Sequence, residues 1–267
     1  MKQFLAIAIL LCSTTVLVAQ DRGGRREDRQ TRKEEKRQRT NAMIRQEEEG
    51  VLSYNKHNAF GLQLRSNGYG FFYERGKMTS PRWANIYGFE FTEVMHPKEE
   101  RSSSAQGFLL GNSFKYGKMN NFYQAKLGYG RQYIFGQKGN KNGVAVIGTA
   151  MGGLSMGLLK PYYLQVNDQG ADREIKYTPQ DSALFLSNSI LGSAGFTKGW
   201  SEVKLRPGLF AKASLRFDFG SYNESISALE IGFSAEGYAK EIEQMIAVEP
   251  RRTFLQVHVA MVFGNRK

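Results

Sequence analysis

The stretch VKLRPGLFAKASLRFDF, residues 203–219, decides the fold of this chain. Its odd positions are apolar from Val203 to Phe219, and its even positions are largely charged, as at Arg206 and Lys212. A period of two places these sets on opposite faces of a β-strand, whereas a helix would scatter both around its axis. At about 3.3 Å per residue the strand would span roughly 55 Å, much longer than strands of soluble sheets.

A strand of this length and polarity is typical of a transmembrane barrel. Such a strand crosses roughly 25 Å of hydrocarbon at a steep tilt, with lipid on one side and a polar lumen on the other. Because alternation averages the hydropathy, the mean hydropathy of −0.46 does not exclude this class of membrane protein. A long curved strand in a soluble sandwich is the alternative interpretation.

The first 19 residues have the pattern of a secretory signal peptide, with Lys2, an apolar core and cleavage expected after Ala19. Cys12 would instead mark a lipoprotein, but bulky Leu11 stands where a small residue is expected before the cysteine. Since Cys12 is the one cysteine of the sequence, the mature chain would contain neither disulfides nor thiol chemistry.

Catalytic and metal chemistry find little support in the sequence. His57, His96 and His258 lie far apart, without metal-ligand spacing, and no serine motif accompanies any of them. We therefore predict a protein that is not an enzyme and binds no cofactor or metal.

Residues 20–50 form a charged segment that we expect to be a periplasmic leader. Residues 21–49 contain ten Lys or Arg and eight Asp or Glu, and almost nothing apolar to bury. This composition predicts disorder or a solvated helix, for which Thr31 and Glu34 offer a capping box. The leader is a spacer or an arm that binds an acidic envelope partner, and an exported chain is not expected to meet nucleic acid.

Residues 51–267 read as short alternating runs separated by turn residues, which predicts an all-β antiparallel up-and-down transmembrane β-barrel. The runs are residues 59–65, 69–75, 86–94, 108–116, 122–135, 144–159, 203–219, 226–238 and 254–263. Because single-chain bacterial barrels have an even number of strands, we predict ten, the tenth near residues 183–191, with eight as the alternative.

Between residues 160 and 200 the alternation fails, which predicts a long connection without regular structure. Long connections of this kind are usually functional, so the segment is the candidate interaction loop. Its acids lack the spacing of a calcium-binding loop. The candidate contact residues are Tyr162, Tyr163, Asp168, Asp172 and Trp200.

These features together resemble small bacterial outer-membrane β-barrel proteins, an architectural likeness over residues 51–267 without an invariant motif. The last run carries Val257, Val259, Met261 and Phe263 on one face. In that family the closing strand commonly ends on an aromatic residue recognised during membrane insertion, which makes Phe263 the candidate insertion signal. The resemblance implies the outer membrane of a double-membraned bacterium, with outer-membrane lipid as a partner, and implies no single activity.

We expect the charged face of residues 203–219 to point into the lumen and to meet acids of the next strand. If the turn is centred on Ser221, Lys212 lies opposite Glu230 and Arg206 lies opposite Glu236. The same register places Phe210 opposite Gly232. The predicted lumen charge network is Lys204, Arg206, Lys212, Arg216, Glu230 and Glu236.

Three functions compete. The first is a non-enzymatic barrel that acts as a structural or interaction subunit of an envelope complex, through the leader or through residues 160–200. The second is a narrow anion-preferring pore or small-ligand carrier, which the basic inner face favours. The third is an outer-membrane lipid hydrolase, for which the three histidines are the candidate bases.

Overall fold

The computed structural model describes residues 32–38, 54–102, 113–138, 143–220 and 224–267. The chain divides into two compact units, residues 1–51 and 52–267. In the first unit residues 32–38 are helical and exposed, whereas the expected signal peptide and the rest of the expected leader lie outside the described residues. No helix in these described ranges has the length and apolar character needed to cross a membrane.

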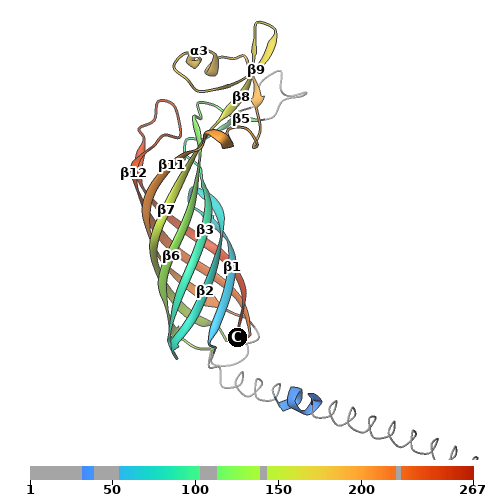
Figure 1. Cartoon of the computed structure of the whole chain (residues 1–267), viewed down its shortest axis with the longest axis vertical. Coiled ribbons are helices and arrows are strands. Elements are labelled where there is room, and N and C mark those ends of the chain that lie inside the picture. The colour runs from blue at the N-terminus through green and yellow to red at the C-terminus, as the bar shows by residue number, and fades with distance from the viewer. Residues whose placement is uncertain (1–31, 39–53, 103–112, 139–142, 221–223) are drawn as a thin grey trace, which may run out of the picture. The chain divides into compact units, whose positions relative to one another are not determined.

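Within the second unit, eight of the described strands close into an antiparallel barrel (Figure 1). Each pairs with the next in chain order, and β1 pairs with β13 to complete the ring. A closed ring leaves no unpaired strand edge, which is the condition for spanning a membrane with strands. The predicted up-and-down barrel is therefore confirmed. Its strands are β1 (Lys56–Arg65), β2 (Gly68–Ser80), β3 (Trp83–Val94), β6 (Asn120–Gly136), β7 (Ala145–Pro161), β11 (Lys204–Asp218), β12 (Ser225–Ile242) and β13 (Arg251–Arg266).

The preferred count of ten strands is wrong, and the alternative of eight describes the barrel formed by the described residues. Run 108–116 does not form a barrel strand among the described residues. Residues 103–112 lie outside these residues, and the end of the run forms β5 (Phe114–Lys115), which pairs with β4 (Arg101–Ser102) in a separate sheet. Residues 183–191 contribute to α3 (Ser182–Phe185) and to the start of β10 (Ile190–Ser193). Both segments bury apolar side chains in a core outside the barrel, so these residues are apolar for packing in that core and not for facing lipid.

The alternation of the sequence becomes an alternation of exposure around the barrel. β1, for example, alternates strictly between exposed and buried residues along its length. Leu64, Leu154 and Leu255 on the outer wall are 72%, 67% and 82% exposed. A continuous apolar wall of this kind is unfavourable in water and favourable against lipid tails. The barrel therefore has the outer surface expected of a protein that spans a membrane with strands.

The two ends of the barrel differ in their connections. At one end, here called the turn end, residues 81–82, 137–144 and 219–224 join the strands, and the C-terminus lies there (Figure 1). At the other, here called the loop end, the connections are residues 66–67, 95–119, 162–203 and 243–250. Most of the described residues of this unit that lie outside the barrel strands are therefore at the loop end.

The predicted structureless connection at residues 160–200 is wrong, because it folds into a small sheet at the loop end. β8 (Tyr163–Asp168) lies between β9 (Ala171–Lys176) and β10, all antiparallel. This loop-end sheet has an apolar core of its own, and Ile246 of the connection 243–250 packs against it. The core residues are Phe114, Tyr162, Leu164, Val166, Ile175, Phe185 and Ile190.

Candidate functional site

The charged interior of the barrel is the first candidate site. Lys212 Nζ of β11 lies 3.0 Å from Glu230 Oε1 of β12 and 2.7 Å from Glu90 Oε1 of β3. Arg216 Nη2 lies 2.5 Å from Glu230 Oε2 and 2.7 Å from Glu74 Oε2 of β2. Each of these five side chains is almost completely buried. The ion pairs thus tie strands on opposite sides of the barrel together.

A second charged group lies nearer the loop end. Glu236 Oε1 on β12 accepts hydrogen bonds from Arg65 Nη2 at 2.6 Å and from Lys126 Nζ at 2.5 Å. The Arg65 guanidinium also donates to the hydroxyl of Ser234 and, at 3.3 Å, to Thr92 Oγ1. One carboxylate therefore serves two cations from β1 and β6.

These two groups are electrically balanced. They contain four cations and four carboxylates, so their charges sum to 4 − 4 = 0. An unpaired buried charge would cost several kcal/mol, whereas pairing and hydrogen bonding offset much of that desolvation. The balance is what a poorly hydrated interior requires.

Apolar layers enclose the charged groups on both sides. A layer toward the loop end includes Phe122, Tyr238 and Phe254, whose rings lie 5.4 to 6.0 Å apart between centroids. A layer toward the turn end includes Ile226 and Val262. Side chains therefore fill the interior, as expected for a barrel of eight strands.

The register predicted for the hairpin of β11 and β12 is wrong. Lys212 lies opposite Ser234 and not Glu230, a shift of 234 − 230 = 4 residues, and Glu230 lies opposite Arg216. The predicted inner and outer faces of both strands are still correct, because a shift by an even number of residues keeps each side chain on the same side of the sheet. The connection is centred beyond Ser221, which itself lies outside the described residues.

The structure places the remaining members of the predicted lumen network elsewhere. Lys204 and Arg206 lie at the loop end of β11, opposite β7, because pairing with β12 begins only at Gly208. Lys204 is exposed and Arg206 is half-buried. The predicted opposition of Arg206 and Glu236 is therefore wrong, and Phe210 faces Glu236.

Sequence reasoning about one hairpin missed four of the eight charges in these two groups. Arg65, Lys126, Glu74 and Glu90 belong to four other strands. Each occupies a buried position in an alternating run, so the pattern could have assigned each to the lumen. The pattern carries no information on which charges meet across the barrel.

Phe263 lies on β13, near its turn-end terminus and opposite Phe60 of β1. Their rings are 5.9 Å apart between centroids, and Phe263 is 39% exposed on the outer wall. Recognition of Phe263 during membrane insertion stays a prediction.

The residues of the predicted interaction loop make contacts within the loop end. Tyr162 is buried in the core of the sheet, and Tyr163 donates a hydrogen bond to Glu202 Oε1 at 2.9 Å. Asp168 forms an ion pair of 2.6 Å with Arg173 across the turn between β8 and β9. These contacts order the segment, while partner binding by it stays a prediction. Asp172 accepts a hydrogen bond from Asn167, and Trp200 stacks on Tyr123 at 5.6 Å.

A buried carboxylate ties the connection between β3 and β6 together. Glu99 Oε1 lies 2.8 Å from Lys118 Nζ, and Glu99 also accepts a hydrogen bond from Lys115. Burial alone would raise the pKa of Glu99, but Lys118 and Lys115 outweigh burial and hold this pKa below its ordinary value. Glu99 is therefore ionised at neutral pH and holds this part of the loop end in place.

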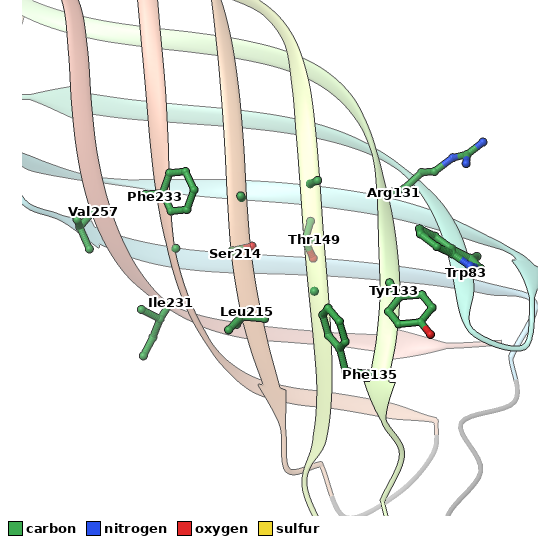
Figure 2. Close-up of a pocket in the computed structure, with 14 residues that line it drawn as sticks. Trp83, Arg131, Tyr133, Phe135, Thr149, Ser214, Leu215, Ile231, Phe233 and Val257 are labelled. Carbon is green, nitrogen blue, oxygen red and sulfur yellow. The ribbon is translucent and has the colours of Figure 1, made fainter.

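A groove of about 600 Å³ lies on the outer wall of the barrel (Figure 2). It forms where β7 and β11 carry small outward residues, Gly148, Ala150 and Ala213, between larger neighbours. In Figure 2, Arg131 and Trp83 lie at one edge, and Phe233 and Val257 lie on the opposite side. The groove belongs to the lipid-facing surface and not to the lumen.

The three histidines do not assemble a hydrolytic site. His57 and His258 are buried inside the barrel, where His258 Nε2 lies 3.4 Å from Glu230 Oε1. His96 lies at the loop end, where its Nδ1 accepts a hydrogen bond from the backbone N–H of Lys98. Within the described ranges no cluster of three His, Cys, Asp or Glu could hold a metal ion.

No protein-family model and no curated protein match the chain. Several solved structures are similar, among them the following three. Neisserial surface protein A is 8% identical with a TM-score of 0.37, over 79% of this chain and 96% of that one. The N-terminal β-barrel domain of Pseudomonas aeruginosa OprF is 9% identical with a TM-score of 0.37, over 79% and 99%. Ail of Yersinia pestis, solved with the heparin analogue sucrose octasulfate, is 12% identical with a TM-score of 0.35, over 79% and 96%. Function has to be inferred from the geometry of the chain itself.

Proposed function

We propose that the protein is a non-enzymatic outer-membrane barrel that acts as a structural or interaction subunit of an envelope complex. The observation that carries the proposal is the contrast between the two candidate sites. The interior is filled by matched charges and apolar layers, whereas the loop end carries a folded sheet with its own core. A filled barrel is a membrane anchor, and an ordered sheet is a surface for binding.

The basic inner face, which favoured the pore alternative, is neutralised by ion pairs. An anion-preferring lumen needs cations that are free to meet a passing solute. Lys212, Arg216, Arg65 and Lys126 are instead each held by a carboxylate at 3.0 Å or less. The ligand-carrier alternative meets the same obstacle, because side chains occupy the interior.

The binding surface that we infer is the exposed side of the loop-end sheet. β9 is an edge strand whose first four residues are exposed, and edge strands offer unpaired backbone groups to a partner. Charges of both signs lie on or beside it, paired as Arg173 with Asp168 and Lys198 with Glu174. Such a surface fits a polar protein partner. In outer-membrane barrels the longer connections face the outside, so this surface would be extracellular and the leader periplasmic.

A site-specific crosslinking experiment in native membranes tests this proposal. A photoreactive residue at Arg173 samples the loop-end sheet, one at Arg37 samples the leader, and one at Pro81 in a short turn is the matched control. We expect a stoichiometric protein adduct from Arg173 or Arg37 and none from Pro81. Absence of a specific adduct at both positions, together with ion conductance by the purified barrel, would contradict the proposal.

A further inference from the structure

Near the loop end the outer wall of the barrel carries aromatic residues on some strands and lacks them on others, β7 and β11 among them. On β2, β3 and β6 an aromatic belt lies at this level, formed by Tyr69, Phe71, Phe91 and Tyr123. β7 has no aromatic residue, and on β11 Phe210 points inward while Phe217 lies near the turn end. Aromatic belts mark the lipid–water interface of membrane barrels. The belt of this barrel is therefore incomplete over β7 and β11.

A loop supplies the missing rings. Residues 194–203, between β10 and β11, place Trp200 on Tyr123 of β6, with ring centroids 5.6 Å apart and planes at 22°. The Phe196 ring lies 5.3 Å from that of Trp200 and 6.4 Å from that of Tyr123. Lys160 Nζ of β7 lies 4.6 Å from the Phe196 centroid and 5.0 Å from that of Trp200. We call Tyr123, Lys160, Phe196 and Trp200 the rim cluster.

The rim cluster continues the lipid-facing wall. Tyr123 pairs with Leu158 of β7, and Leu158 pairs with Leu205 of β11, which is 57% exposed on the outer wall. The rings thus sit over the uppermost apolar row of these strands. Beyond that row toward the loop end comes the exposed cation Lys204.

Backbone geometry fixes the loop at this position. Gly199 has a φ of +86°, and a Cβ there would lie 2.8 Å from the carbonyl oxygen of Pro161 at the end of β7. The Trp200 indole Nε1 also donates a hydrogen bond of 3.0 Å to the carbonyl of Phe196. Only a glycine fits this close approach without strain, so the sequence itself holds the rings against the barrel.

Exposure of the rings indicates an occupant. Tyr123 is buried by the cluster, but Phe196 is 65% exposed and Trp200 is 39% exposed. The indole ring and the amphipathic Lys160 suit the interface, where one side of a group is apolar and the other is wet. We propose that residues 194–203 insert Phe196 and Trp200 into the outer lipid–water interface and complete the aromatic belt over β7 and β11. The occupant of this surface is lipid, not a protein partner.

This insertion also positions the loop-end sheet. The inserted loop follows β10 directly, and its Glu202 binds Tyr163 of β8 and lies 2.5 Å from Lys176 of β9. The loop therefore fastens the sheet to the membrane surface as well as to the barrel.

Tryptophan fluorescence can test the proposal, because the sequence has two tryptophans at opposite ends of the barrel, Trp83 and Trp200. The variant Trp83→Phe leaves Trp200 as the one fluorophore in the full chain. In phosphatidylcholine vesicles, we expect bromine near the headgroup end of the acyl chains to quench Trp200 about twofold more than bromine at the chain ends, because indole rings prefer the lipid–water interface. Aqueous iodide should quench it weakly.

A matched pair of second variants localises the effect. Phe196→Ala in the Trp83→Phe background should reduce quenching by lipid and increase quenching by iodide. Phe135→Ala removes an equally exposed ring at the other end of the barrel and should leave both values unchanged. Efficient quenching of Trp200 by iodide with no quenching by either brominated lipid would overturn the proposal, and the Trp83→Phe variant decides this alone.

Discussion

Replacing Glu230 by Gln tests whether the barrel interior is a sealed network of ion pairs. Glu230 is fully buried and contacts Arg216 at 2.5 Å and Lys212 at 3.0 Å. The change leaves the two charged groups described above with four cations and three carboxylates. Removing one partner of a buried ion pair typically lowers the free energy of unfolding by about 3–5 kcal/mol. We expect a loss in this range for Glu230→Gln.

The matched control is Glu241→Gln. Glu241 also forms an ion pair, 2.9 Å from Arg252, but both side chains are largely exposed at the loop end. Exposed pairs contribute about 0–1 kcal/mol, so this variant should unfold almost like the parent protein. Unfolding is measured by denaturant titration in lipid vesicles, with folded and unfolded forms separated by their mobility on unheated gels.

A compensating variant distinguishes charge balance from damage to packing. Lys212→Met combined with Glu230→Gln restores equal numbers of cations and carboxylates in the two charged groups. The double variant should therefore be more stable than Glu230→Gln alone, which is a positive coupling in a double-mutant cycle. If Glu230→Gln costs no more than the exposed control, the interior is hydrated and the sealed-network reasoning fails.

Three further predictions follow from other parts of the molecule. In planar lipid bilayers the purified barrel should show no steady ion conductance, and stepwise openings in most insertions would contradict a filled interior. The folded-state pKa of Glu99 lies below its ordinary value of 4.5, so its contribution to stability is present above that value and lost as the pH falls through the folded-state pKa. Protease cleavage of the loop end should accordingly accelerate below about pH 4.5, and equal acceleration in Glu99→Gln would refute this cause. Deleting residues 21–49 should leave barrel assembly intact, as judged by gel mobility, and weaken any partner contact made by the leader.

Much of the barrel could be predicted because its signal is local. Strands such as β1 and β11 can be recognised from alternation within a few residues, and this alternation also predicts which face of the sheet each side chain occupies. The number of strands could not be obtained in this way. Phe114, near the end of one alternating run, is buried in the loop-end core and not in the barrel, because a period of two does not reveal which sheet a strand joins.

The loop-end sheet was predictable in part. Gln169 and Gly170 both have positive φ, at 54° and 91°, which is the signature of the tight hairpin turn between β8 and β9. The sequence Asp168-Gln169-Gly170 between two short alternating runs could have revealed this hairpin. Interior contacts such as Lys212 with Glu90 could not be read from the chain, because they join strands 122 residues apart.

The seam where the ring closes has a kinetic consequence. Arg65 on the first strand reaches past β13 to Ser234 and Glu236 on β12, and its ion pair with Glu236 joins residues 171 positions apart. The Arg65 guanidinium on β1 therefore lacks its Glu236 partner until β12, late in the chain, has joined the barrel. An open sheet would expose that charge to hydrocarbon, which is strongly unfavourable. Closure of the ring and entry into the bilayer are thus expected to occur as one cooperative step, whose slow part is bringing the chain ends together.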